Sequence, residues 1–164
     1  MDIKGLLNDF GKSEELQKQA VFTSIFIIQN RLQTACDKLE DDITVKQWLL
    51  LAMASVCHEP PTLTTLGRLM GCSRQNVKKL AGALEKKGYL QIDKDAAKGN
   101  TASIIITAKT QEYYDGKSDL HEHLFRLLFQ DFSSDEIMLV YGFIKKFYKG
   151  VSRIEKLAER VSEE

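Results

Sequence analysis

The fold is decided by the stretch from Thr62 to Thr107, TLTTLGRLMGCSRQNVKKLAGALEKKGYLQIDKDAAKGNTASIIIT. It predicts a short helix that ends at Gly71, because glycine readily adopts the left-handed conformation that follows many helices. Ser73 is a good N-cap, so a second helix is expected to begin directly after it. The inward stripe of this second helix has the spacing i, i+3, i+4 and i+7 and consists of Val77, Leu80, Ala81 and Leu84.

The outer face of the second helix carries basic and amide side chains and almost no acidic ones. Gln and Asn can read the edge of adenine, whereas Lys and Arg reach guanine or phosphate. Gln75 and Asn76 are therefore the expected base readers, and the cations are expected to supply charge. A solvated helix face without a partner is the alternative. The candidate DNA-binding residues on this helix and at its start are Ser73, Arg74, Gln75, Asn76, Lys78, Lys79 and Lys86.

A two-stranded hairpin is predicted after the second helix ends at Lys87-Gly88. Residues 89–92 and 104–106 form the expected strands, and Gly99-Asn100 suits a turn between them. Cationic side chains near such a tip could lie along the DNA backbone or in the minor groove, which makes Lys94, Lys98 and Asn100 further candidates. Two helices joined by a tight turn and followed by a hairpin are typical of a winged helix-turn-helix. The expected fold class is therefore mainly α with a small β-hairpin wing.

The distribution of charge supports a nucleic-acid partner more than the total does. The chain has 164 residues, 43% of them apolar, which is enough for a globular core, and its formal net charge is zero. Residues 62–109 nevertheless contain nine basic and three acidic residues, a net charge of +6, and the remainder therefore carries −6. Because attraction to phosphate is screened over about 8 Å at physiological salt, local charge matters more than the sum.

The segments before this stretch predict two helices. The first covers residues 13–39, where the apolar spacing 4-3-4-3-4 indicates a seam that packs along another helix. A second helix opens at Thr44, which forms a capping box with Gln47, and must end before Pro60-Pro61. The seam of the first helix consists of Val21, Ile25, Ile28, Leu32, Ala35 and Leu39.

The segment after the stretch predicts two further long helices. Thr107 is a natural cap for a helix over residues 108–129, in which Gly116 is a weak point. Ser133 and Glu136 form another capping box before the last helix. The seam of that helix has the spacing 3-4-3-4-3-4 and consists of Ile137, Val140, Ile144, Phe147, Val151, Ile154 and Ala158.

Two long seams at opposite ends of the chain favour a homodimer, because a winged helix of under 50 residues is too small to cover both. An internal helical bundle in a monomer is the alternative. The expected division is residues 1–43 for N-terminal dimerisation, 44–109 for the winged helix-turn-helix, and 110–164 for the C-terminal helices that complete the dimerisation region.

Several other classes of protein are not indicated. The N-terminus lacks the pattern of a signal peptide, and no stretch approaches the ~20 apolar residues that span a bilayer. The cysteines, Cys36, Cys57 and Cys72, are scattered without CxxC spacing, so we expect a reduced, cytoplasmic protein without a membrane partner. No set of nucleophile, base and orienting group stands out, so we expect no enzyme, no cofactor and no metal.

An ordered set of residues resembles the MarR family (multiple antibiotic resistance regulator type) over most of the chain. The resemblance implies a homodimer that binds pseudo-palindromic double-stranded DNA, usually as a repressor, and often releases it on binding a small aromatic effector. Each protomer is then expected to place residues 74–87 in a major groove, with the two helices ~34 Å apart. The matching residues are Gln47-Trp48, Leu66, Met70, Ser73, Val77, Leu84-Glu85, Gly88-Tyr89-Leu90, Thr107 and the run Phe132-Ser133-x-Asp135-Glu136.

The resemblance also implies an effector pocket between the dimerisation helices and the DNA-binding lobe. Phe26, Trp48, Tyr113 and Tyr114 are the candidate lining residues, although aromatic residues at such positions are more often part of the core. The family usually has Asp-x-Arg in the wing, whereas this chain has Lys98 and Asn100 there, so the expected minor-groove arginine is missing.

Alternatives from other classes stay open at this point. Some family members sense peroxide through a reactive cysteine, but Cys36 and Cys57 fall in predicted helices and are expected to be inert. Cys72, in the turn, is the thiol expected to be most accessible. Some relatives bind zinc, for which Cys36, His58 and Glu40 would be the candidates. The last alternative is a winged-helix protein–protein interaction module without DNA binding.

Overall fold

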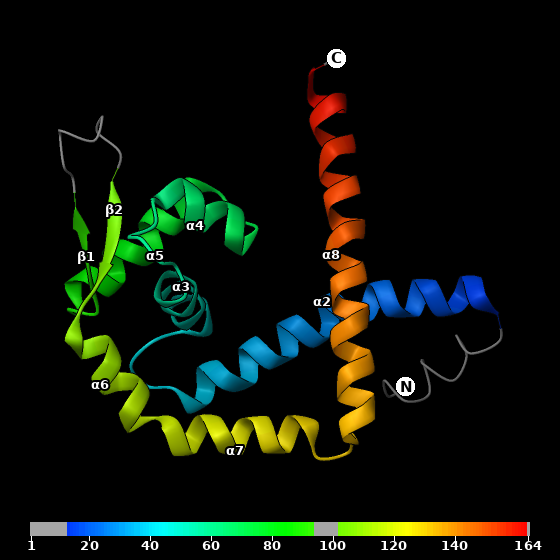
Figure 1. Ribbon diagram of the computed structural model, residues 1–164, viewed down its shortest axis with the longest axis horizontal. Coiled ribbons are helices and arrows are strands. Elements are labelled where there is room, and N and C mark those ends of the chain that lie inside the picture. The colour runs from blue at the N-terminus through cyan, green and yellow to red at the C-terminus, as the bar shows by residue number, and fades with distance from the viewer. Residues whose placement is uncertain (1–12, 94–101, 164) are drawn as a thin grey trace. The chain divides into compact units, whose positions relative to one another are not determined.

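The computed structural model describes residues 13–93 and 102–163 as a mainly helical chain with one two-stranded sheet (Figure 1). The candidate wing residues Lys94, Lys98 and Asn100 lie outside this description. The predicted fold class is confirmed. The chain forms two compact units, Met1–Tyr114 and Asp115–Glu164. Its elements are α2 (Glu14–Leu39), α3 (Val45–Ser55), α4 (Leu63–Met70), α5 (Arg74–Lys86), β1 (Leu90–Asp93), β2 (Ser103–Ile106), α6 (Ala108–Gly116), α7 (Ser118–Phe129) and α8 (Ser134–Glu163).

Side-chain caps fix the starts of α2, α3, α4 and α5. The hydroxyl of Ser13 accepts a hydrogen bond from a backbone N–H in the first turn of α2. At α3 the predicted capping box is present: the N–H of Gln47 donates to the Thr44 hydroxyl at 3.3 Å, and the N–H of Thr44 donates to the Gln47 side chain at 3.0 Å. Thr62 and Ser73 cap α4 and α5 in the same way. These caps satisfy amide groups that a helix leaves unpaired at its start.

The core of the first unit is built around α3. This helix contacts α2, α4, α5 and β2, and Leu50 and Leu51 are completely buried within it. From α5, Val77, Ala81 and Leu84 are buried against the core, whereas Leu80 is half-buried. The inward stripe of α5 is therefore as predicted, and its burial turns the opposite face of the helix outward.

The turn between α4 and α5 depends on two glycines. Gly71 adopts the left-handed conformation, with φ of 63°, as predicted. Gly67, which the sequence did not single out, is buried, and a Cβ atom there would lie 2.7 Å from the carbonyl oxygen of Cys72. The N–H of Cys72 donates to the carbonyl of Gly67 at 2.9 Å. This close backbone approach holds the two helices in a helix-turn-helix.

The hairpin is joined to the helix-turn-helix through the backbone. Its strands are antiparallel, with Leu90 opposite Ile106. The N–H of Ile104 donates to the carbonyl of Pro61 at 2.9 Å, and the N–H of Leu63 donates to the carbonyl of Ala102 at 3.3 Å. The segment before α4 is thereby tied to β2, which fixes the base of the hairpin beside the helices.

The predicted helix over residues 108–129 is divided into α6 and α7 at the weak point, Gly116. Thr107 precedes α6, but its hydroxyl donates to the carbonyls of Gly88 and Tyr89, at 2.7 and 2.9 Å. In the second unit, Ser133 and Glu136 form the predicted capping box at the start of α8. Among the described residues, no helix combines the length and the apolar character that crossing a membrane would require.

Candidate nucleic-acid interface

The outer face of α5 presents every candidate of the helix-turn-helix to solvent. These residues can face outward because the buried stripe on the other side of α5 fixes the rotation of the helix about its axis. The exposed candidates are Ser73, Arg74, Gln75, Asn76, Lys78, Lys79 and Lys86. Side chains on one exposed helix face can contact a single extended partner together.

The charge of this face is not neutralised within the described part of the chain. Glu85 is the single acidic residue of α5, and its carboxylate accepts a hydrogen bond of 2.7 Å from the N–H of Ile92 in β1. No ion pair with another described residue engages the cations of α5. They remain available to an anionic partner. These cations are Arg74, Lys78, Lys79 and Lys86.

The end of α5 is tied to the loop that follows α2. The hydroxyl of Tyr89 donates to the carboxylate of Asp42, and the ammonium of Lys87 donates to the backbone carbonyl of the same residue. Burial, followed by the hydrogen bond and charge of Asp42, raises the pKa of Tyr89 above its ordinary value. We call the contacts among Asp42, Lys87 and Tyr89 the Asp42 clamp. Sequence reasoning missed it, because nothing local in the chain signals a partner 47 residues away.

Tyr89 is also held from the side of α6. The hydroxyl of Thr110 donates to the carbonyl of Tyr89 at 2.5 Å, in addition to the bond from Thr107. The ammonium of Lys109 lies 4.7 Å from the centre of the Tyr89 ring and donates to the carbonyl of Lys87 at 2.8 Å. The segment between α5 and β1 is therefore fastened to both α6 and the loop after α2. These contacts hold the C-terminal end of α5 beside the loop after α2 and beside the start of α6.

The candidate effector residues occupy different environments. Trp48 and Tyr114 pack against the core cluster that contains Tyr113, and the rings of the two tyrosines are 5.6 Å apart. Burial, with the charge of Glu40, raises the pKa of Tyr113. Phe26 instead lies on α2 with 56% of its surface exposed. Three of the four candidates, Trp48, Tyr113 and Tyr114, thus belong to the hydrophobic core of the first unit or pack against it.

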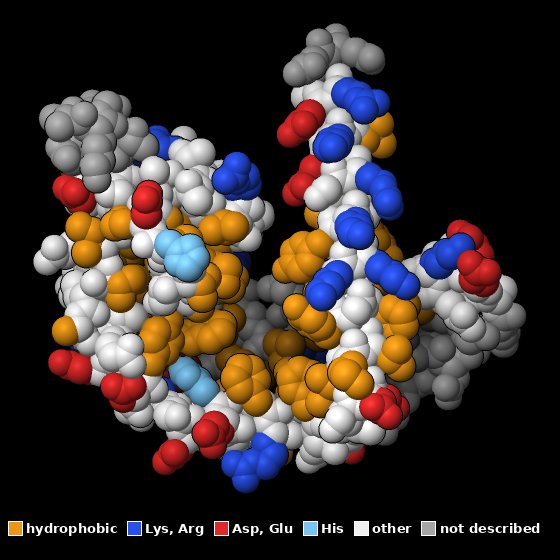
Figure 2. All heavy atoms as spheres, viewed as in Figure 1, with side chains coloured by type: hydrophobic (Ala, Val, Ile, Leu, Met, Phe, Trp, Pro, Cys, Tyr) orange, Lys and Arg blue, Asp and Glu red, His pale blue; other side chains and the backbone are white. Residues whose placement is uncertain are grey.

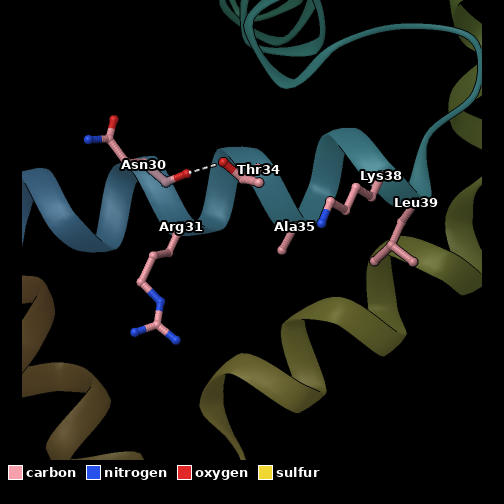
Figure 3. Close-up of a pocket in the computed structure, with 6 residues that line it drawn as sticks. All are labelled: Asn30, Arg31, Thr34, Ala35, Lys38 and Leu39. Atoms are coloured by element: carbon pink, nitrogen blue, oxygen red, sulfur yellow. Dashed lines mark hydrogen bonds between the residues drawn. The ribbon is translucent and has the colours of Figure 1, made fainter. Parts of the chain in front are cut away.

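A hollow in the surface lies along the C-terminal half of α2 (Figure 3). Its lining contains none of the candidate effector residues. The hydroxyl of Thr34 in this lining donates to the carbonyl of Asn30 at 2.9 Å. All lining residues come from a single helix, so the hollow is an open groove. They are Asn30, Arg31, Thr34, Ala35, Lys38 and Leu39.

The three cysteines differ little in exposure, since each is half-buried. None of them forms a disulfide. Burial and the neighbouring carboxylates of Asp37 and Glu40 raise the pKa of the Cys36 thiol. The thiol of Cys57 donates to the carbonyl of Met53 at 3.2 Å. Within residues 13–93 and 102–163, no cluster of three metal-ligating side chains is present.

The two predicted seams are exposed to solvent. On α2, Ile25 is 46% exposed and Ile28 is 54% exposed. On α8, Val151 is 48% exposed and Ile154 is 62% exposed. Apolar rows of this length are uncommon on the surface of a soluble monomer, and they usually mark an interaction surface.

The sequence matches no family model and no curated protein. Solved structures, in contrast, are similar over most of the chain. A MarR/EmrR family transcriptional regulator from Acinetobacter sp. ADP1 is 19% identical with a TM-score of 0.73, over 83% of this chain and 97% of that one. The transcriptional regulator SlyA is 22% identical with a TM-score of 0.68, over 81% of this chain and 94% of that one.

A third similar structure was solved with a bound ligand. It is an organohalide-sensing transcriptional regulator in its 2,4-dichlorophenol-bound form, 14% identical with a TM-score of 0.71, over 86% of this chain and 83% of that one. The TM-scores show a shared fold, and at identities this low the similarity shows the fold alone. The chain is therefore a winged helix-turn-helix protein with the fold of the MarR-family transcriptional regulators.

Proposed function

We propose that the protein is a homodimeric, sequence-specific DNA-binding transcriptional regulator that represses transcription until a small aromatic ligand releases it. The observation that carries the proposal is the outer face of α5, where exposed cations lie beside exposed amides and form no ion pair with a described residue. Residues 44–109 are the DNA-binding lobe in this proposal. Residues 1–43 and 110–164 form the dimerisation region.

In the proposed complex, α5 enters the major groove. Gln75 and Asn76 read base edges near the start of the helix, and Arg74 and Lys78 contact phosphate. The two-fold axis of the dimer places the second recognition helix one DNA turn, ~34 Å, away. If the dimer contacts roughly 6–10 phosphates, affinity falls by about 10³–10⁵ between 50 and 200 mM salt.

The DNA-binding proposal is tested with a duplex taken from the region upstream of the protein's own gene. Fluorescence anisotropy measures binding by the wild type and by the double variant Arg74→Gln, Lys78→Gln. We expect the variant to lose affinity and to show a shallower salt dependence. Lys18→Gln is the matched control, because Lys18 is an exposed cation on α2 whose charge is paired with Glu14 at 2.7 Å. A wild type that binds neither this duplex nor random DNA at low salt would favour a protein–protein interaction module instead.

The proposed dimer buries the exposed seams of α2 and α8. Sedimentation equilibrium tests it with Phe147→Glu, which places a charge on the α8 seam at a residue that is 43% exposed. We expect this variant to be monomeric at concentrations where the wild type is a dimer, because an unpaired charge is costly to bury. Val56→Glu is the control, since Val56 is 70% exposed and lies at the end of α3, outside both seams. A wild type that sediments as a monomer rules the dimer out.

The proposed effector site includes Trp48, Tyr113 and Tyr114, which lie in the core of the first unit or against it. Similarity to a regulator with bound 2,4-dichlorophenol supports an aromatic ligand. Trp48 is the single tryptophan of the chain, so its fluorescence reports directly on this region. We expect titration with 2,4-dichlorophenol to change the emission and to weaken DNA binding over the same concentration range. Emission that changes without any effect on DNA binding would contradict an effector role.

A thiol-based mechanism has less support. The thiolate is the reactive form of cysteine, and the raised pKa of Cys36 keeps that residue protonated at neutral pH. Cys57 is engaged by the carbonyl of Met53. The ligand-controlled regulator is therefore the function that we propose.

A further inference from the structure

The last helix, α8, carries a second cationic surface that the charge count of the sequence concealed. Outside residues 62–109 the net charge is −6, which predicts an anionic scaffold. Figure 2 shows instead that Lys and Arg side chains form a column along α8. We call these residues the α8 stripe. They are Lys145, Lys146, Lys149, Arg153, Lys156 and Arg160.

Helix geometry places the whole α8 stripe on one face. At 3.6 residues per turn, the steps of four residues from Lys145 to Lys149 and on to Arg153 keep these side chains together. The step of seven residues from Lys149 to Lys156 returns to the same line, and all six cations fall within an arc of roughly 100°. Glu155 and Glu159 flank this arc on one side without entering it. The row from residue 145 to residue 160 is about 22 Å long.

The α8 stripe is unneutralised and exposed. Every member is exposed to solvent, and no member forms an ion pair with another residue in the described part of the chain. Lys145 lies 4.3 Å from the ring centre of Tyr141, and Lys146 lies 5.5 Å from that of Phe143, contacts that leave the charges in place.

Repulsion between the cations of the α8 stripe destabilises the isolated helix. Like charges at i, i+4, as in Lys145–Lys149, Lys149–Arg153 and Lys156–Arg160, each destabilise a helix by about 0.2–0.5 kcal/mol. A helix face on which positive and negative side chains alternate would be equally soluble without this repulsion. An anionic partner would remove the repulsion and gain from every cation.

The opposite side of α8 limits what that partner can be. It carries the apolar seam, which the proposed dimer occupies, and a helix that binds a bilayer surface must insert its apolar side into the membrane. A nucleic acid requires only the cations. Successive phosphates of one strand advance about 3.4 Å along the duplex axis, so a row of about 22 Å is long enough to reach several phosphates.

We propose that the α8 stripe binds the phosphate backbone of double-stranded DNA, separately from α5 and without sequence preference. The inference rests on the proposed function, because the dimer must cover the apolar seam for the α8 stripe to be the free side of the helix. The stripe consists of Lys and Arg alone and offers no Asn or Gln to read bases, whereas α5 offers both. The α8 stripe would hold DNA and α5 would select the sequence.

The test compares three full-length variants on a random duplex of about 40 base pairs, with binding followed by anisotropy from 50 to 200 mM salt. The stripe variant is Lys149→Gln, Arg153→Gln, Lys156→Gln. The recognition variant is Arg74→Gln, Lys78→Gln. The control variant, Lys18→Gln, Lys46→Gln, Arg126→Gln, removes three exposed cations, as the stripe variant does, but from α2, α3 and α7. Glutamine has nearly the helix propensity of lysine, and circular dichroism checks that helix content is unchanged.

We expect the stripe variant to have a shallower slope of log affinity against log salt, by about 0.9 for each phosphate that it no longer neutralises, while the control keeps the wild-type slope. A stripe variant that matches the control overturns the proposal, even if the upstream duplex is bound normally. If the upstream duplex is bound no better than random DNA but the stripe variant still has the shallower slope, the proposed regulator fails and the α8 stripe stands. If the stripe variant loses binding to phosphatidylglycerol vesicles while its binding to the random duplex is unchanged, the α8 stripe binds a lipid surface. That result would also overturn the proposal.

Discussion

Tyr89→Phe removes one hydroxyl from the Asp42 clamp and leaves the rest of the packing in place. Tyr89 is 1% exposed, and its ring contacts Tyr113 at 5.7 Å and Lys109 at 4.7 Å, contacts that phenylalanine retains. A hydrogen bond to a charged group contributes about 1.5–3 kcal/mol. Asp42 is exposed, so water can replace the lost donor, and we expect a loss near the lower end, about 1.5 kcal/mol. For a chain of this size that corresponds to a fall in Tm of about 3–6 °C.

The same variant changes how stability depends on pH. The folded protein holds the phenol proton of Tyr89 more tightly than the unfolded chain does, because its pKa is raised. The stability that the protonated Tyr89 hydroxyl contributes is fully present below pH ~10, the ordinary pKa of tyrosine. It is lost as the pH rises from there toward the raised pKa of Tyr89 in the folded protein. Above pH ~10 the wild type should therefore lose up to about 1.4 kcal/mol per pH unit more than Tyr89→Phe. The difference in the free energy of unfolding between the wild type and Tyr89→Phe therefore becomes smaller above pH ~10.

Urea unfolding at a fixed protein concentration, followed by circular dichroism, measures both effects. Tyr148→Phe is the control, because Tyr148 is 72% exposed and the same hydroxyl is removed from a solvated ring. A double-mutant cycle with Asp42→Asn isolates the pair, and we expect a coupling of about 1 kcal/mol or more between residues 42 and 89. If Tyr89→Phe is as stable as Tyr148→Phe, or if the cycle shows no coupling, the Asp42 clamp does not stabilise the fold.

The remaining predictions concern backbone geometry, capping and the wing. Gly67→Ala should lower the free energy of unfolding, because the added Cβ would lie 2.7 Å from the Cys72 carbonyl oxygen. Gly82→Ala should raise the free energy of unfolding by up to about 1 kcal/mol, because nothing lies within 4 Å of a Cβ there. If urea titration shows no difference between the two variants, the close approach at Gly67 is refuted. Thr44→Ala should cost about 0.5–2 kcal/mol in the same assay, and an unchanged midpoint would show that the capping box is dispensable. Lys98→Ala should reduce the salt slope of DNA binding by about 0.9 per protomer, and an unchanged slope excludes the proposed wing contact.

The helices and their faces were accessible to sequence reasoning because they depend on local rules. The capping boxes at Thr44 and Ser133 and the left-handed residue at Gly71 are determined by neighbours within a few positions. The buried stripe of α5 repeats at the period of the helix, so both its inward face and its outward face follow from the spacing alone. The candidate DNA-binding residues on α5 come directly from that spacing.

Contacts between distant segments were not accessible in this way. Gly67 reads as an ordinary helix residue until the fold brings the Cys72 carbonyl against it. Asp42 reads as the end of a helical pattern, and only the packed lobe brings it to Tyr89. A summed charge likewise hides the α8 stripe, because a sum ignores which side of a helix each cation occupies.

Local signals in the chain were enough for the order of the elements, the fold class and the face of α5 that turns outward, because helical period and capping act over a few residues. Folding in three dimensions was needed to fasten α5 to the loop after α2 and to α6 through Tyr89, since these contacts join segments from separate parts of the chain. It also divided the predicted long helix at Gly116, because the local signal marked a weak point without deciding whether the helix continues.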